Sequence, residues 1–385
     1  MFQWKEYRFR YFDFRLVLFI LALSIIGVLV IGSAAPDAGY DTKQLACLIV
    51  GSVIMLFLAL VDYHFVLKFY WLIYVLNIGL LLVVRFFGDA GGGAQRWIRF
   101  GSVGLQPSEL AKIFIILFFA KLFWKYEHRV NSFKMIFASV FLFGIPLALV
   151  FIQPDLSTSI VLVALFCSLL FLANLSYKII LGVSIVIIPT VSVLFYKILQ
   201  EGQTILNDYQ RARILGFLYQ DSDDPLITSI NYQQKNSVLA IGSGQLSGKG
   251  LNNNTITSVK NGNFLSEPQT DFIFSIVGEE LGFVGSVIVV LLICLIIIEC
   301  LWIAFHAKDL AGKIIAGGMA AWLAFQSFIN LGVATWILPN TGLTLPFVSY
   351  GMSSLMSLLI GMGIVLNVSL QRPRTFKETL NSDTD

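Results

Sequence analysis

Four ionisable residues stand at the margins of apolar runs in which charged side chains are rare. Asp271 lies in TDFIFSIVGEELG, Asp155 lies in QPDLST, and Glu109 and Lys112 share QPSELAKI. A charged side chain at the margin of a membrane helix either caps that helix or lines a polar site, where a carboxylate can act as a general base. We expect Asp271 to line such a site, and the other three residues to converge on it.

Each of these residues also has a purely structural explanation. Glu109 and Lys112 are three residues apart, so they share a helix face and could form only an intrahelical ion pair. Asp155 follows a proline and could be a helix cap, and Asp271 or the neighbouring Thr270 could cap the helix that follows. The topology of the chain favours a shared site over these separate explanations.

The composition indicates a polytopic membrane protein of the all-α class. Of the 385 residues, 57% are hydrophobic and 13% are charged, and the mean hydropathy is +0.81. The basic N-terminal stretch is not followed by a cleavage site, so the first span should be retained. We expect a single integral membrane domain over 1–385, with ten apolar spans near 16–35, 45–61, 65–84, 108–124, 135–152, 158–174, 179–199, 272–304, 314–338 and 345–368.

The basic residues predict the orientation of these spans. Lysines and arginines gather before the first span and in short loops after the even-numbered spans, such as 125–134, and such loops are cytoplasmic. Both termini would then be cytoplasmic. The segment 85–107 would lie outside, and 200–270 would form a large extracellular loop between the seventh and eighth spans. The fourth, sixth, eighth and tenth spans would all begin on the outside, which brings the four ionisable residues to one face.

Further polar residues belong to the same expected cavity. The loop GGGAQRWIRFG supplies arginines beside a tryptophan, a combination that suits an anionic headgroup, although a lone tryptophan can be a simple interface anchor. The amphipathic stretch DYQRARILGFL supplies two more cations. Besides the four residues above, the candidate cavity residues are Gln95, Arg96, Trp97, Arg99, Arg211, Arg213, Glu267, Thr270, Ser349, Ser353 and Ser354.

Other motifs give less evidence of a functional site. The four cysteines lie in apolar runs without a C-x-x-C pair, and the three histidines are scattered, so disulfides and zinc are not expected. The glycines of AIGSGQLSGKGL do not form a Walker A loop, because Gly250 stands after Lys249 where Ser or Thr is required. A tight loop packed on the helices is the better interpretation.

Six motifs in a fixed order resemble those of the SEDS family (shape, elongation, division and sporulation). They are GAQRWI, QPSELAK, QPDLSTS, AIGSGQLSGKGL, TDFIFSIVGEELGFVG and PFVSYGMSS. The resemblance spans nearly the whole chain and is closer to the elongation branch than to the division branch. Ser157 stands where the family usually has glycine.

The resemblance implies a ten-helix peptidoglycan glycosyltransferase that polymerises lipid II on the outer face of the bacterial cytoplasmic membrane. It implies a class B penicillin-binding protein as crosslinking partner, other membrane proteins of the elongation complex, and no nucleic acid. The partner's transmembrane helix would pack on the eighth and ninth spans, where small residues permit close approach. These residues are Gly282, Gly285, Gly317 and Gly318.

The resemblance also makes Asp271 the counterpart of the family's essential aspartate. As general base, Asp271 would deprotonate the acceptor hydroxyl, and inversion at the anomeric carbon needs no covalent intermediate. The lipid pyrophosphate leaving group needs positive charge, either from the candidate cations Lys112, Arg96, Arg99, Arg211 and Arg213 or from a divalent cation such as Mg²⁺ or Mn²⁺. A lipid II flippase and a non-enzymatic cell-wall scaffold are the alternatives.

Overall fold

The computed structural model describes residue 7 and residues 9–91, 94–100, 103–153, 155–200, 208–219, 224–252, 258, 264–265 and 267–372. The α-helices are α1 (Phe14–Ala34), α2 (Tyr40–Ala59), α3 (Tyr63–Leu67), α4 (Tyr70–Phe87), α5 (Pro107–Lys125), α6 (Phe133–Ile152), α7 (Leu156–Leu172), α8 (Tyr177–Leu199), α9 (Asp208–Leu218), α10 (Pro225–Ser243), α11 (Ile273–Phe305), α12 (Leu310–Ala334) and α13 (Met352–Leu370). Short 3-10 helices are η1 (Phe9–Tyr11), η2 (Pro36–Ala38) and η3 (Glu127–Arg129).

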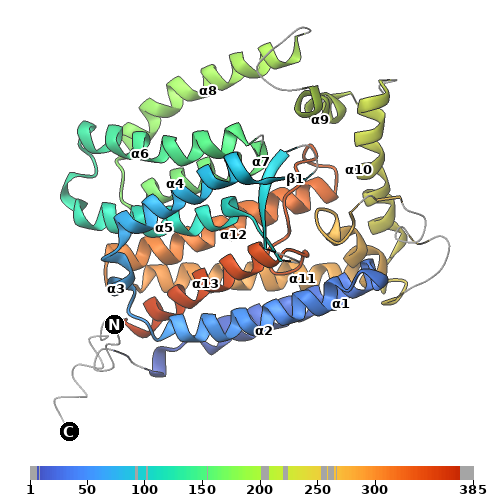
Figure 1. Cartoon of the computed structure of the whole chain (residues 1–385), viewed down its shortest axis with the longest axis horizontal. Helices are drawn as coiled ribbons and strands as arrows, with labels where there is room; N and C mark the ends of the chain where they lie inside the picture. The colour runs from blue at the N-terminus through green and yellow to red at the C-terminus, as the bar shows by residue number, and fades with distance from the viewer. Residues whose placement is uncertain are drawn as a thin grey trace.

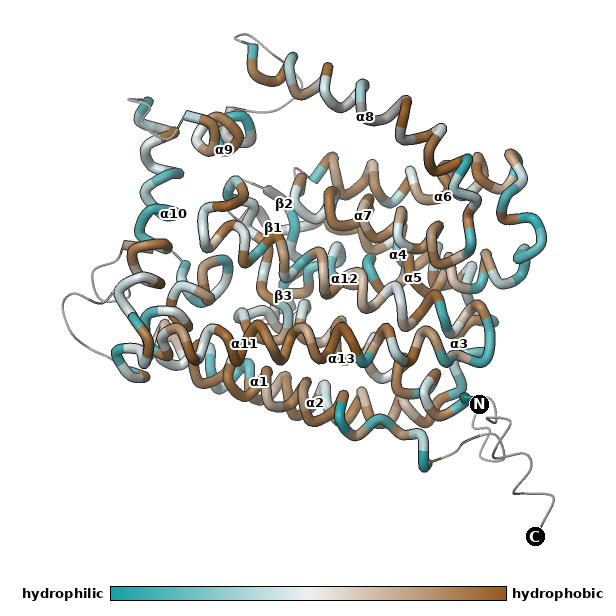
Figure 2. Tube along the Cα trace, turned by 180° about the vertical axis from the view of Figure 1, so that it is seen from behind, coloured by the Kyte–Doolittle hydropathy of each residue, from teal (hydrophilic) through white to brown (hydrophobic). Residues whose placement is uncertain are grey.

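The helices have the length and composition of membrane spans. Among the described residues, seven helices are long and apolar enough to cross a bilayer, namely α1, α2, α4, α6, α11, α12 and α13, and α7 is a shorter apolar helix. Apolar residues run along the middle of the bundle helices (Figure 2). The chain is therefore a multi-pass helical membrane protein, as the composition predicts.

Two predicted spans differ most from the structure. The expected span 65–84 falls on α3 and α4, which are separated at Lys68 and Phe69. The last span begins at Met352 and not at 345. Pro346 disfavours helix at the residue before it, and the backbone N–H of Leu345 donates to Ser349 Oγ over 2.8 Å instead of continuing a helix.

The all-α prediction misses a small antiparallel sheet. Strands β1 (Asp89–Gly91), β2 (Ala94–Phe100) and β3 (Val103–Leu105) lie in that order, with Asp89 opposite Trp97 and Ile98 opposite Leu105. The sheet packs on α4, α5 and α13. Figure 1 shows β1, α9 and α10 toward one end of the bundle and α3 toward the other.

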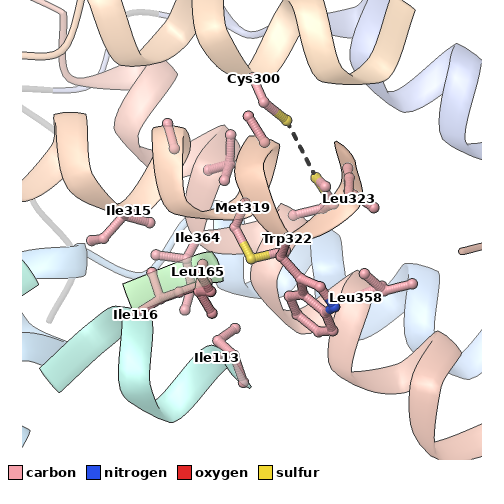
Figure 3. Close-up of a cluster of buried hydrophobic side chains, with 14 of the residues drawn as sticks. Ile113, Ile116, Leu165, Cys300, Ile315, Met319, Trp322, Leu323, Leu358 and Ile364 are labelled. Carbon is pink, nitrogen blue, oxygen red and sulfur yellow. Dashed lines mark hydrogen bonds between the residues drawn. The ribbon is translucent and has the colours of Figure 1, made fainter. Parts of the chain in front are cut away.

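Helix α12 lies at the centre of the packing. It contacts α5, α7, α11 and α13, and its Trp322 and Met319 are fully buried among the side chains of Ile113, Ile116 and Leu165 (Figure 3). A Cβ atom at Gly318 would lie 2.8 Å from Leu169 Cδ2, and one at Gly317 would lie 2.6 Å from Leu172 Cδ1. The prediction that these two glycines face a partner helix is therefore wrong, because they allow close approach of α5 and α7 of the same chain.

Helix α11 is interrupted at Gly282, where φ is 67°. The glycine-rich loop after α10 fills the interruption: Lys249 N donates to Glu279 O, and Phe283 N donates to Gln245 O. A Cβ atom at Gly282 would lie 2.2 Å from Gly248 N, so it too contacts this loop and not a partner. The expectation of a tight loop packed on the helices is confirmed.

Candidate active site

The turn before α11 carries Asp271, and hydrogen bonds tie this turn to the loop between α12 and α13. Ser349 Oγ donates to Thr270 O over 2.6 Å, and Tyr350 N donates to Gln269 O over 2.9 Å. The N-cap of α11 is Phe272, and that cap position has no side-chain bond. Neither Asp271 nor Thr270 therefore occupies the cap position of α11.

Gly342 brings a backbone segment close to both Asp271 and Arg213. A Cβ atom at this position would lie 3.3 Å from Asp271 Oδ2 and 3.9 Å from Arg213 Nη2. Arg213, on α9, donates from Nη1 to Thr341 O over 3.2 Å. The φ of Gly342 is +76°, a conformation that glycine adopts without strain. The carboxylate and the guanidinium thus flank one glycine.

Arg96 on β2 and Asp155 at the start of α7 extend this group. Arg96 Nη1 lies 3.9 Å from Asp155 Oδ1, and Arg96 Nε donates to Gln153 O over 3.3 Å. Asp155 also caps α7 by accepting from Thr158 N over 3.2 Å, so its predicted structural role is confirmed. Ser157 Oγ donates to Thr341 O, the same carbonyl that Arg213 uses.

The surroundings of Asp271 favour its protonated form. Asp271 is half-buried, and burial raises its pKa to about 6. The Glu267 carboxylate adds to the rise, while Arg213, Arg96 and the Thr270 hydroxyl oppose it. A carboxylate with a pKa near neutral is suited to accept a proton during catalysis.

Glu109 and Lys112 form the predicted pair, but inside the bundle. Lys112 Nζ lies 2.7 Å from Glu109 Oε1 and 2.8 Å from Gln326 Oε1, and 4.9 Å from the centre of the Trp322 ring. Lys112 is 0% exposed and Glu109 is 5% exposed. Lys112 therefore has no access to a leaving group in this structure. The pair instead bonds to α12 through Gln326.

Three further candidates, Ser353, Ser354 and Arg211, contact neighbouring segments of the chain. Ser353 Oγ accepts from Gln106 N and donates to Gly104 O, so it joins the starts of α13 and α5. Ser354 Oγ lies 3.4 Å from Thr344 Oγ1. Arg211 donates to the carbonyls of Ile198 and Leu199 and thus binds the end of α8.

The sheet residues lie beside the site with different exposures. The Trp97 ring covers Gly104, where a Cβ atom would lie 3.0 Å from Trp97 Cε3. Arg99 is exposed, as is Glu267. Gln95 pairs with Ala90 in the strand register. The hydrogen bonds of Ser353, Ser157 and Ser349 bring the starts of α5, α7, α11 and α13 toward one region, whereas the Glu109–Lys112 pair lies inside the bundle.

Several residues of this group were not predicted from the sequence. Thr341 and Gly342 lie in LPNTGLTLP, whose Pro, Asn and Gly indicate a turn but not its neighbours. Gln326 and Asn330 are buried amides four residues apart in α12. Their spacing in an apolar span is the signal that could have revealed them.

The described residues do not fit a divalent cation. Among them, no three His, Cys, Asp or Glu side chains gather closely enough to hold a metal ion. Asp155, 3.9 Å from Arg96, already accepts a hydrogen bond at the start of α7. An apolar cavity of about 560 Å³ lies elsewhere, between α1, α11 and residues 247–251, and its lining does not include Asp271.

Comparison with known proteins identifies the family. A family model described as "FTSW_RODA_SPOVE: Cell cycle protein" matches residues 14–374. Peptidoglycan glycosyltransferase MrdB of Escherichia coli is 38% identical over 346 residues, covering 89% of this chain and 90% of MrdB. Stage V sporulation protein E of Bacillus subtilis is 34% identical, covering 93% and 96% of the two chains.

Two solved structures share the fold. The rod shape determining protein RodA of Thermus thermophilus aligns with a TM-score of 0.69 at 27% identity, covering 94% of this chain and 98% of RodA. A chain from a structure of a peptidoglycan synthase complex, concerned with the coordination of polymerization and crosslinking, aligns with a TM-score of 0.78 at 27% identity, covering 94% and 99%. The motifs, the fold and the extent of the match together show that this chain belongs to the FtsW/RodA/SpoVE family of cell cycle proteins.

Proposed function

We propose that this protein is a peptidoglycan glycosyltransferase of the elongation type, which polymerises lipid II with Asp271 as the general base. The observation that carries the proposal is the placement of Asp271, whose pKa is raised to about 6, beside Gly342 and Arg213. The name of the relative MrdB, a peptidoglycan glycosyltransferase, supplies the reaction class.

In the proposed reaction, Asp271 takes the proton of the acceptor sugar hydroxyl as that oxygen attacks the anomeric carbon of the donor. The bond from this carbon to the pyrophosphate breaks, and the configuration inverts in one displacement. Arg213 and Arg96 both lower the pKa of Asp271, so they lie within electrostatic reach of it and are placed to stabilise the departing lipid pyrophosphate. Lys112 is excluded from this role by its burial.

We further propose ten membrane crossings, made by α1, α2, α4, α5, α6, α7, α8, α11, α12 and α13. In this topology both termini are cytoplasmic, residues 1–385 form one integral domain, and the segment 200–270 with α9 and α10 lies outside the cytoplasmic membrane. The meeting of the starts of α5, α7, α11 and α13 supports it, because alternate spans must begin on the same side.

A class B penicillin-binding protein is the proposed partner, together with other membrane proteins of the elongation complex. The likeness to a chain of a peptidoglycan synthase complex supports a crosslinking partner. We place the partner's transmembrane helix on the exposed face of α11 that includes Val284, Val287 and Leu291. Replacing Val287 and Leu291 by lysine should abolish co-purification, whereas lysine at the exposed Phe137 and Phe141 of α6 should not. Equal losses would move the contact elsewhere.

The decisive experiment compares wild type with Asp271→Asn, using purified full-length protein and lipid II. The amide keeps the shape of the side chain but does not accept the proton, so glycan polymer should form about 10²–10⁴-fold more slowly. A folded Asp271→Asn protein with near wild-type activity would remove Asp271 from the chemistry. Wild-type protein that binds or moves lipid II but never polymerises it would indicate a flippase or a scaffold.

A further inference from the structure

Helix α12 carries two buried amides one turn apart, Gln326 and Asn330. Gln326 is 0% exposed and Asn330 is 1% exposed. A polar side chain inside a membrane bundle costs free energy unless it is hydrogen-bonded. The partners of these two amides therefore indicate what the amides hold in place.

Asn330 joins two segments that are distant in the sequence. Its Nδ2 donates to Asp271 O over 2.9 Å and to Leu343 O over 2.6 Å. The first carbonyl belongs to the turn before α11, and the second to the loop after α12. Because one nitrogen bonds to both, the spacing between Asp271 and Leu343 is fixed. Rotating the amide by half a turn would place its oxygen against two carbonyl oxygens, so only one orientation is stable.

Gln326 grips the next residue of the same loop. Its Nε2 donates to Thr344 O over 2.9 Å and to Thr344 Oγ1 over 3.2 Å. Its Oε1 accepts from Lys112 Nζ and from Trp322 Nε1. The loop is thus anchored at residue 344 to the buried core around Lys112, one residue away from the bond that Asn330 makes.

The backbone of the loop between α12 and α13 has a conformation that such hydrogen bonds must hold in place. Trp336 has φ 57° and Phe347 has φ 64°, a left-handed conformation that bulky residues rarely adopt. Strained residues of this kind persist only where the surroundings hold them. Gly342, which approaches the Asp271 carboxylate, lies between these two residues.

We propose that Asn330 and Gln326 are positioning residues that keep residues 341–344 against Asp271, so that its carboxylate stays beside Gly342 and Arg213. The inference rests on the proposed function, in which Asp271 is the base. Neither amide contacts the reacting groups in this scheme; both act through the segments that they hold.

The test uses Asn330→Leu in the full-length protein, assayed with lipid II across a range of pH. Leucine is similar in size but donates no hydrogen bond. A small displacement of the base should lower kcat on the order of 10²-fold with little change in KM. The apparent pKa of kcat should also fall from about 6 toward the ordinary aspartate value, because a released Asp271 gains solvent. Asn330→Ala, which removes the donor and adds no bulk, gives the same readouts if the leucine variant does not fold.

Asn367→Leu is the matched control. Asn367 is equally buried and bonds to Ala59 O and Tyr63 N, far from Asp271 at the other end of α13. This variant should lose thermal stability but keep kcat and the pH profile of the wild type. An equal kcat loss and pH shift in Asn367→Leu would show a general effect of losing a buried amide and would overturn the inference.

Asp271→Asn separates the assignment of the base from the inference about positioning. If Asp271→Asn is inactive while folded Asn330→Leu matches the wild type in kcat and pH profile, the positioning inference is wrong and the base assignment stands. If Asp271→Asn is active, the base assignment fails and the inference fails with it. In the expected outcome, Asn330→Leu has no further effect on the residual rate of Asp271→Asn.

Discussion

The Lys112 ammonium and the Glu109 carboxylate lie 2.7 Å apart in a part of the bundle that solvent does not reach. The second carboxylate oxygen of Glu109, Oε2, has no hydrogen-bond partner among the described residues. Lys112 is thus the main source of compensation for a buried negative charge. Breaking such a pair from one side leaves an isolated charge in a medium of low dielectric constant.

We therefore expect Glu109→Gln and Lys112→Met each to destabilise the protein by about 3–5 kcal/mol. The double variant should lose clearly less than the sum, because neither charge is then left alone. Thermal unfolding in detergent, measured for all four members of the cycle, checks this expectation. Additive losses would show that the two residues do not interact.

The raised pKa of Asp271 predicts opposite effects of pH on activity and on stability. The rate of polymerisation should rise with pH and reach half its maximum near pH 6, as the carboxylate loses its proton. Because the folded pKa lies above the unfolded value, the native state binds more protons, and stability falls as pH rises from about 4 to 6.

Asp271→Asn lacks this titration and should be more stable than wild type at pH 7.5, by roughly 3 kcal/mol at most for a shift of this size. Paired melting curves at pH 4.5 and pH 7.5 measure the difference. A variant that is less stable than wild type at pH 7.5 would contradict the raised pKa of Asp271, because the carboxylate would then stabilise the fold.

Gly342→Ala should impair catalysis by crowding the carboxylate. The added methyl group would lie 3.3 Å from Asp271 Oδ2, at a φ of +76° that alanine rarely adopts. We expect a stability loss of about 1–3 kcal/mol from the backbone, and a fall in kcat of at least about 10-fold from the displaced base.

Gly250→Ala provides the control for this variant. Gly250 has φ +90°, and an added Cβ atom would meet no atom within 4 Å. It should share the backbone penalty but retain kcat. If both variants lose activity equally, the effect of Gly342→Ala comes from strain and not from its proximity to Asp271.

The proposed topology predicts opposite labelling of two exposed positions. His128 lies in η3, and Lys235 lies on α10. With the four native cysteines replaced, an impermeant thiol reagent applied to intact cells should label Lys235→Cys and spare His128→Cys. Labelling of His128→Cys alone would reverse the orientation and place Asp271 on the cytoplasmic side.

The sequence predicts the contacts that depend on spacing along one helix. The Glu109–Lys112 pair and the cap at Asp155 follow from local spacing, and the structure contains both. The neighbours of Asp271 could not be predicted in this way, since Gly342 and Asn330 reach it from segments about 60 to 70 residues later in the chain. Their contacts depend on how helices pack, which hydropathy and spacing do not specify.

The predictions that the structure contradicts fail for the same reason. The sequence does not predict the sheet at 89–105, because β1 and β3 have only three residues each and β2, AQRWIRF, lacks strict alternation of polar and apolar residues. Lys112 was expected in the cavity because the sequence gives its position along α5 but not the direction in which its side chain points. Gly317 and Gly318 were assigned to a partner because small residues allow close packing without specifying the neighbour.

The interruption of α11 at Gly282 has a consequence for how this protein is built into the membrane. The backbone groups released there are bonded by residues 245–250, so the final form of α11 includes bonds to a segment outside the helix. Residues 245–250 leave the ribosome before α11 does. The segment that bonds the interrupted backbone of α11 is therefore synthesised before the helix that it completes.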